Sequence, residues 1–265
     1  MTPATPPTPT DIRIDGRVIR LKWHRARRTA TDAPFTLGRI VEGLACGASV
    51  EIDVRTGPGG VPVIRHDPLQ WWRRVRPVDL IPLSAVGDEL TNRGVVDLPA
   101  RARLQLDIKD TARVLTTAVA QQISADVSSF ADAVVASGND PVAVARIAEQ
   151  DPRTATGHDP CTRSAVRRLR RTGDVDGFVA TALEADRGAG IIYLDHRIIL
   201  ALAATGTDIV ASFHAAGRQV DAYTFAGPDP ETLGQVRALI DLGIDQITTD
   251  DPEGLYRALR SVPRT

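Results

Sequence analysis

The sequence predicts an α/β protein built as a single (β/α)8 TIM barrel. Its 265 residues suit one large α/β domain, although length alone does not exclude two small ones. Short apolar runs alternate with helical stretches along the chain, which is the pattern of a parallel sheet covered by helices. Charged residues directly follow several of these runs, where barrel active sites form. We therefore expect one barrel.

Eight apolar runs of strand length account for the wall of the expected barrel. Because helical stretches separate them, neighbouring strands should be parallel, and eight such units in about 240 residues fit this fold. In chain order, strands are expected at residues 18–23, 49–54, 103–109, 131–136, 153–157, 190–195, 219–225 and 246–249.

Helical patterns fill the intervals between these strands. The best-marked helix begins with Asp229 as N-cap and Pro230 at the first helical position, and Gly243 follows its end. The expected helices cover residues 35–46, 111–126, 141–150, 161–187, 197–217 and 230–242.

An excursion is expected after the second strand. The sequence Gly-Pro-Gly-Gly at residues 57–60 indicates a turn, and residues 61–64 have the character of a short returning strand. Such a hairpin would bring His66 back toward the end of the second strand.

The two ends of the chain and its composition restrict its class. Residues 1–15 are rich in proline and threonine and are expected to be disordered, with the barrel domain covering residues 16–265. No signal peptide and no apolar run of membrane-spanning length is present, which favours a cytoplasmic protein without an integral membrane segment. The net charge of -1 argues against a nucleic-acid partner. Cys46 and Cys161 lack metal-ligand spacing and are interpreted as core residues.

The most informative residues lie at the ends of the first three expected strands. Glu51 and Asp53 are two residues apart on one strand, so both side chains point to the same side and can hold one cation. His24-Arg25 follows the first strand, and Asp107-Ile108-Lys109 ends the third. With His66 returning on the hairpin, these residues supply the parts for metal-assisted phosphodiester hydrolysis.

The ordered set of motifs resembles the glycerophosphodiester phosphodiesterase family, whose members are TIM-barrel enzymes that use one divalent cation. Each motif is weak by itself, but together they cover nearly the whole barrel in the family's order and spacing. The matching elements are His24-Arg25 and residues 47–54, 60–67, 106–109, 217–224 and 243–252.

The resemblance implies a role for each matching residue. Glu51, Asp53 and Asp107 would bind the metal, either Mg²⁺ or Ca²⁺, which both take oxygen ligands. His24 and His66 would be the acid and base, with His66 as the preferred acid. The resemblance assigns substrate binding to Arg25, Lys109 and Tyr223, and implies hydrolysis of a small glycerophosphodiester to an alcohol and glycerol 3-phosphate in lipid metabolism.

Several positions depart from the family pattern. Ala26 stands where glycine usually follows His-Arg, Asp107 replaces the usual glutamate, and Tyr223 replaces the usual tryptophan. The inserted substrate-handling domain is missing, and Trp71-Trp72 in the shortened segment are candidates for a lid. Two alternatives therefore stay open: a diesterase for lysophospholipid or sugar-phosphate diesters, and a phosphoester-binding barrel with impaired catalysis.

An arginine cluster in the expected helix 161–187 lies outside these motifs. We interpret it as a solvated helix face paired with acidic residues. A polyanion site is the alternative, which the absence of interleaved aromatic residues disfavours. The cluster comprises Arg163, Arg167, Arg168, Arg170 and Arg171.

Overall fold

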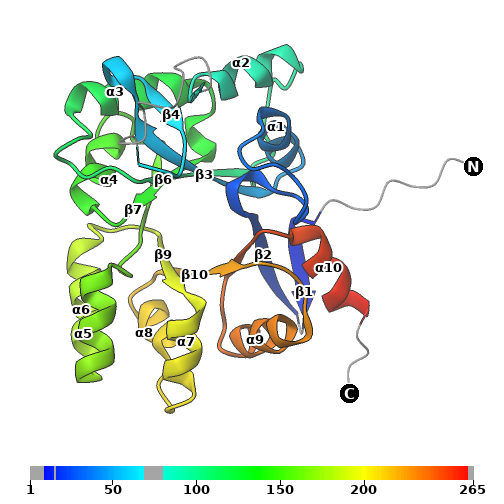
Figure 1. The fold of residues 1–265 in the computed structure, drawn as a ribbon, viewed down its shortest axis with the longest axis vertical. Helices are drawn as coiled ribbons and strands as arrows, with labels where there is room; N and C mark the ends of the chain where they lie inside the picture. The colour runs from blue at the N-terminus through cyan, green and yellow to red at the C-terminus, as the bar shows by residue number, and fades with distance from the viewer. Residues whose placement is uncertain (1–8, 15, 69–79, 262–265) are drawn as a thin grey trace, which may run out of the picture.

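The chain forms a closed barrel of eight parallel strands with helices between them (Figure 1). The structure is a computed structural model that describes residues 9–14, 16–68 and 80–261. The barrel closes where β2 pairs with both β3 and β11. Its strands, in order around the wall, are β2 (Arg17–Trp23), β3 (Ser49–Thr56), β6 (Arg103–Ile108), β7 (Val134–Gly138), β8 (Ala155–His158), β9 (Ile191–Asp195), β10 (Gln219–Phe225) and β11 (Gln246–Thr249).

The predicted fold class is confirmed, and all eight expected strands overlap an observed one. Their boundaries differ by up to three residues. The largest difference is at β7, where residues 128–133 form the 3-10 segment η5 (Ser128–Ala133) before the strand begins at Val134. The expected hairpin is also present, because β4 (Pro62–Ile64) pairs antiparallel with β3.

Two expected helices are each split into two by a glycine. Residues 161–187 form α5 (Arg163–Thr172) and α6 (Val175–Ala185), with Gly173 between them at φ 66°. Similarly, α7 (His196–Ala203) and α8 (Ile209–Ala215) are separated by a turn containing Gly206 at φ 84°. Only glycine adopts this left-handed conformation at little cost, so Gly173 caps the end of α5 and Gly206 allows the turn that follows α7.

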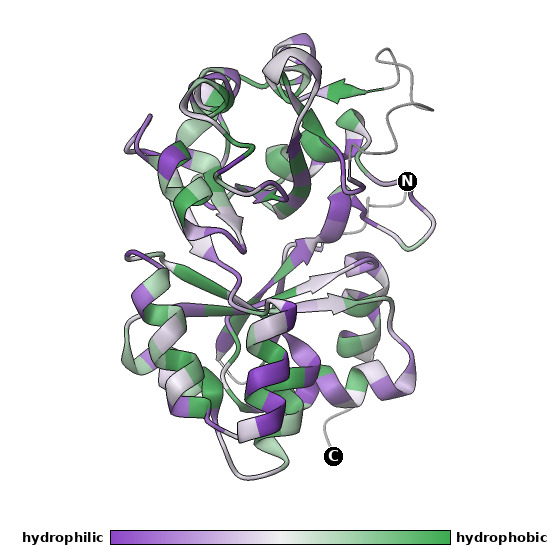
Figure 2. Cartoon of the chain, turned by 60° about the vertical axis from the view of Figure 1, so that its left-hand side comes forward, coloured by the Kyte–Doolittle hydropathy of each residue, from purple (hydrophilic) through white to green (hydrophobic). Residues whose placement is uncertain are grey.

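The remaining helices cover the outside of the barrel. Apolar side chains form one cluster beneath α1 to α4 and a second beneath α5 to α10. Figure 2 shows hydrophobic and hydrophilic segments alternating along these helices, as expected for helices with one buried face. The helices not yet introduced are α1 (Leu37–Ala45), α2 (Ala85–Asn92), α3 (Thr117–Val127), α4 (Pro141–Ala148), α9 (Pro230–Asp241) and α10 (Pro252–Ser261).

The N-terminal segment differs from expectation in its described part. Residues 1–8 and 15 lie outside the described residues, but β1 (Asp11–Ile14) pairs antiparallel with β2. Ile12 is buried, and the Trp23 indole donates a hydrogen bond to the Pro9 carbonyl oxygen. Disorder was therefore the wrong expectation for residues 9–14, because the strand buries an apolar side chain and satisfies backbone groups.

None of the described helices is long and apolar enough to cross a membrane. The remaining short elements are η1 (His24–Ala26), η2 (Pro58–Gly60) and β5 (Ile81–Pro82).

Candidate active site

The sequence-predicted residues converge on a pocket at the carboxyl ends of the barrel strands. The pocket has a volume of about 160 Å³. Asp53 lies beside it, almost fully buried, in contact with two of its basic residues. The other seven predicted residues line the pocket: His24, Arg25, Glu51, His66, Asp107, Lys109 and Tyr223.

Strand register brings the three carboxylates together. Asp53 of β3 is paired directly with Asp107 of β6, and Glu51 lies two residues earlier on the same face of β3. One oxygen from each carboxylate lies within 4.8 Å of the others. Such a cluster can hold a metal ion, as the sequence predicted.

The buried carboxylates lack enough hydrogen-bond donors. Asp53 Oδ2 is buried and has no hydrogen-bond partner among the described residues. Burial, with Asp53 and Asp107 nearby, raises the pKa of Glu51 well above its usual value. A divalent cation would supply the missing positive charge, and an all-oxygen donor set suits a hard cation such as Mg²⁺ or Ca²⁺. The residues present therefore fit a resident cation.

Two basic residues contact the cluster. Lys109 Nζ lies 2.8 Å from Asp53 Oδ1 and 2.5 Å from Asp107 Oδ2. Burial opposes its charge, but the Asp107 and Asp53 carboxylates raise the Lys109 pKa, so the amine stays protonated. The Arg25 backbone amide donates to Glu51 Oε2 at 2.7 Å, and its guanidinium Nε lies 3.4 Å from Asp53 Oδ2. Both side chains can also face an anionic ligand in the pocket.

The turn after β2 holds Arg25 in an unusual backbone conformation. Arg25 and Ala26 have φ values of 52° and 57°, in the left-handed region that favours glycine. This explains why glycine is customary after His-Arg in the family that the sequence resembles. With Ala26 the turn keeps its shape at a cost of about 1–2 kcal/mol.

A carboxylate that the sequence analysis did not single out orients His24. Asp250 Oδ1 lies 2.8 Å from His24 Nδ1. Burial acts to raise the Asp250 pKa, but the hydrogen bond with His24 helps to lower it below its usual value. The Asp250 carboxylate therefore accepts a hydrogen bond from His24 Nδ1–H. His24 Nε2 is then left without the proton in the neutral ring, and lies 4.0 Å from Glu51 Oε2.

His66 returns to the pocket on the expected hairpin but is less enclosed than His24. Its side chain is 45% exposed and its Nδ1 lies 3.2 Å from Asp67 Oδ1. The candidate lid residues Trp71-Trp72 lie outside the described residues. His196, which the motifs do not include, contacts the Tyr223 carbonyl oxygen through Nδ1 at 2.8 Å and packs against Phe225, which is a structural role.

The far side of the pocket carries Asp159, which the sequence analysis also missed. The Tyr223 hydroxyl lies 3.1 Å from each oxygen of Asp159, and the Cys161 amide donates to Oδ1 at 2.8 Å. Burial and the nearby Asp107 raise the Asp159 pKa to about 6. Asp159 directly follows β8, and Asp250 directly follows β11. A search for acidic residues at strand ends, which identified Asp107, would therefore have found both.

This shift predicts a pH-dependent effect of Asp159→Asn. The folded chain holds a proton on Asp159 between pH ~4 and 6 that the unfolded chain has released, so ionisation at neutral pH destabilises the fold. Asparagine keeps an oxygen acceptor without the charge. We expect the variant to gain about 1–2 kcal/mol over wild type at pH 7.5 and little at pH 4. Urea unfolding with chelator present measures this gain.

The exposed Asp132 provides the matched control for this experiment. Its side chain is 80% exposed, so Asp132→Asn should give no pH-dependent difference from wild type. A stability difference for Asp159→Asn that stays constant from pH 4 to 7.5 would contradict the assignment.

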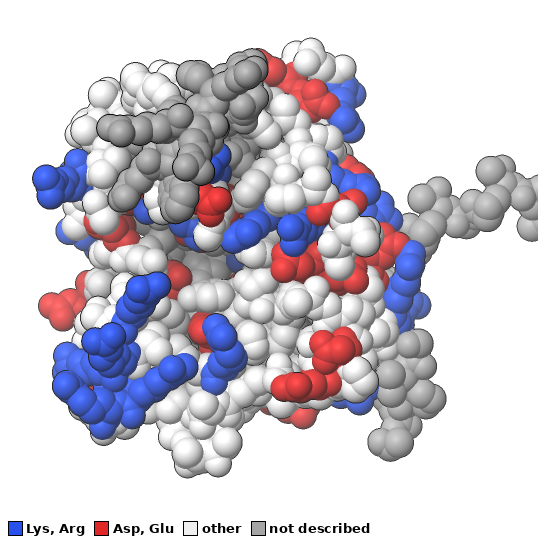
Figure 3. All heavy atoms as spheres, in the orientation of Figure 1, with Lys and Arg blue, Asp and Glu red and all other residues white. Residues whose placement is uncertain are grey.

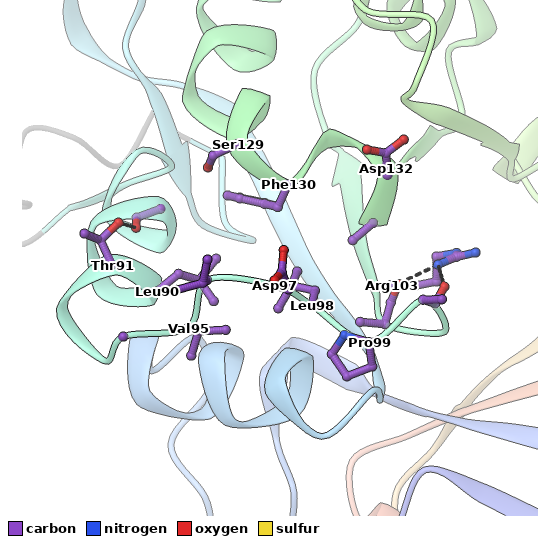
Figure 4. Close-up of a pocket in the computed structure, with 16 residues that line it drawn as sticks. Leu90, Thr91, Val95, Asp97, Leu98, Pro99, Arg103, Ser129, Phe130 and Asp132 are labelled. Carbon is purple, nitrogen blue, oxygen red and sulfur yellow. Dashed lines mark hydrogen bonds between the residues drawn. The ribbon is translucent and has the colours of Figure 1, made fainter.

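A second cavity lies at the opposite end of the barrel wall (Figure 4). It has a volume of about 440 Å³ and lies between α2, the segment leading into β6, and η5. Arg103, at the amino end of β6, lines it, whereas Asp107 near the carboxyl end of the same strand lines the candidate site. The lining of this second cavity mixes apolar residues such as Leu90, Leu98 and Phe130 with the charged Asp97, Arg103 and Asp132.

Comparisons with solved structures identify proteins of the same fold. No protein-family model and no curated protein sequence matches the chain. A structure from Silicibacter pomeroyi described as a glycerophosphoryl diester phosphodiesterase superposes with a TM-score of 0.66 and 18% identity, covering 91% of this chain and 93% of that one. A glycerophosphodiester phosphodiesterase from Parabacteroides distasonis gives 0.61 and 18%, with coverage of 91% and 96%.

A phosphodiesterase from Oleispira antarctica, solved with the product sn-glycerol-3-phosphate, gives a TM-score of 0.54 and 16% identity, covering 91% of this chain and 96% of that one. At these identities the likeness concerns the fold. The chain therefore has the (β/α)8 barrel fold of the glycerophosphodiester phosphodiesterases of known structure, over nearly its whole length.

Proposed function

We propose that the chain is a divergent glycerophosphodiester phosphodiesterase that hydrolyses a phosphodiester with one divalent cation. The observation that carries the proposal is the meeting of Glu51, Asp53 and Asp107 with two histidines and two basic residues in and beside one pocket. The pocket lies at the end of the barrel where active sites of this fold form. The fold shared with phosphodiesterases supports the same reading.

The cation would be held by Glu51, Asp53 and Asp107. When bound, it would offset the negative charge that develops on the phosphoryl oxygens. Arg25 and Lys109 complement it by holding the non-bridging oxygens, since both carry fixed positive charge next to the cluster. The described pocket is small and lined mostly by polar side chains, which favours a compact diester such as a glycerophosphodiester over a lysophospholipid.

His24 and His66 are proposed to move the protons. His24 presents Nε2 to the pocket because Asp250 accepts from Nδ1–H, so the neutral ring can take the proton from the attacking oxygen. As that oxygen bonds to phosphorus, the bond to the leaving alcohol breaks. His66 would protonate the departing alkoxide. The attacking oxygen belongs either to water or to a neighbouring substrate hydroxyl.

A panel of diesters tests the proposal. Purified protein is incubated with glycerophosphodiesters of varied alcohol, with lysophospholipids and with sugar-phosphate diesters, in Mg²⁺, Ca²⁺ or chelator. We expect a glycerophosphodiester to give glycerol 3-phosphate and free alcohol only with a cation. If the cation and a diester bind in titrations but no diester in the panel is cleaved, the chain is a phosphoester-binding barrel without catalysis.

A further inference from the structure

The arginine cluster of α5 is an exposed basic surface. All five of its arginines are exposed on a helix of ten residues (Figure 3, lower left). At 100° per residue, Arg163, Arg167, Arg170 and Arg171 lie on one side of the helix, while the apolar side carries the buried Leu169. The helix therefore presents a band of guanidinium groups to solvent.

The expectation that acids neutralise this band is wrong. Within the described residues, only Arg168 of the cluster has an acidic partner within 4 Å, and Asp174 lies 3.9 Å away with both side chains exposed. Some exposed arginines elsewhere are tightly paired, as Arg197 with Asp195 and Arg153 with Asp151, at 2.7 and 2.6 Å. Others, such as Arg113 and Arg237, lack a close acidic partner among the described residues, but they stand alone, whereas α5 carries four such arginines on one side of one helix. The charge of α5 is left for an external partner.

An apolar pocket of about 220 Å³ lies on the opposite side of α5 from this band. It lies between α5 and α6, with Leu169 and Phe178 among its lining residues, and Arg168 also lines it. Pro160 and Asn139, at the carboxyl ends of β8 and β7, line the same pocket. Asp159, between His158 and Pro160, lines the candidate active site. The pocket and the first turn of α5, which follows β8, thus lie toward the active-site end of the barrel.

We propose that the arginine band of α5 forms a docking surface for an anionic phospholipid bilayer. Guanidinium groups bind phosphate oxygens well, and several basic residues on one side of a helix are attracted together to an anionic membrane surface. A nucleic acid matches less well, because α5 contains no aromatic side chain for base stacking and the net charge of the chain is -1.

Vesicle sedimentation of the full chain tests this surface without depending on the proposed hydrolysis. The protein is mixed with vesicles of phosphatidylcholine alone or with phosphatidylglycerol added, at low and high salt. We expect binding only to the anionic vesicles, and its loss at high salt. The triple variant Arg163→Gln, Arg167→Gln, Arg170→Gln should weaken that binding at least about tenfold.

A second triple variant controls for net charge: Arg13→Gln, Arg113→Gln, Arg237→Gln removes three exposed arginines outside α5. It should bind anionic vesicles like wild type. The proposal is overturned if the wild-type protein does not bind anionic vesicles, or if both triple variants lose binding to the same extent. The proposal would also be overturned, in favour of a nucleic-acid partner, if single-stranded DNA displaced the protein from the vesicles at a phosphate concentration below that of the anionic lipid.

Discussion

Replacing Glu51 by glutamine is expected to lower metal-dependent turnover by about 10³-fold while stabilising the metal-free protein. Loss of one of three carboxylates weakens cation binding, and a cation offsets several kcal/mol of developing charge. The same change also removes an unfavourable buried carboxyl group. Burial and the nearby Asp53 and Asp107 raise the pKa of this group. Glutamine retains an oxygen for the Arg25 amide, so the turn after β2 should persist.

The two effects are measured separately. Turnover is assayed across a Mg²⁺ or Ca²⁺ titration, and stability by urea unfolding in chelator at pH 7. We expect the unfolding free energy in chelator to rise by about 1 kcal/mol or more. Glu184→Gln, on the exposed side of α6, should change neither quantity. A Glu51→Gln variant with undiminished metal-dependent turnover would end the metal assignment.

The second large effect concerns the interior of the barrel. Lys22 Nζ lies 3.1 Å from Asp221 Oδ2, with both side chains almost completely buried. Lys22 also contacts Gln105 and lies over the Tyr193 ring, while Thr248 donates to Asp221 at 2.7 Å. Lys22→Met would leave the Asp221 charge buried without its cation. We expect a loss of about 3–5 kcal/mol in the free energy of unfolding.

A double variant distinguishes an unpaired charge from poor packing. Lys22→Met with Asp221→Asn removes both charges and keeps an oxygen acceptor for Thr248, so it should recover at least half of the loss. Urea unfolding at pH 7 measures the wild type, both single variants and the double variant. If Lys22→Met does not fold, recovery of a folded double variant tests the same point. A double variant as unstable as the sum of the two single variants would contradict the explanation.

Much of the barrel was predictable because its strands are local patterns. Apolar runs of strand length between helical stretches marked all eight strands, because that pattern lies within one short segment of sequence. The start of β7 and the breaks at Gly173 and Gly206 were not, because each depends on a turn whose backbone conformation the apolar pattern does not record. The pairing of residues 11–14 with β2 was missed because it depends on a contact across the sequence.

The site was predictable to a similar degree. Glu51 and Asp53 share one face of β3, and Asp107 lies near the end of the neighbouring strand β6, so side-chain alternation and strand order place them together. Asp250, which orients His24, comes from the last strand, and its contact with the first exists only because the barrel closes. The contact of Asp159 with Tyr223 likewise forms only because the strands on the far side of the barrel lie side by side. These contacts join residues more than 50 positions apart in sequence.

The sequence by itself determined the order of strands, the side of each strand that carries charge, and the presence of oxygen ligands suited to a cation. Those features depend only on residue types and on how apolar and polar residues alternate within one segment. Only the tertiary structure decided that Asp250 orients His24, that Lys22 is neutralised inside the barrel, and that the arginines of α5 lack close acidic partners. Each of those depends on distances between segments, which are set only when the barrel closes and its core packs.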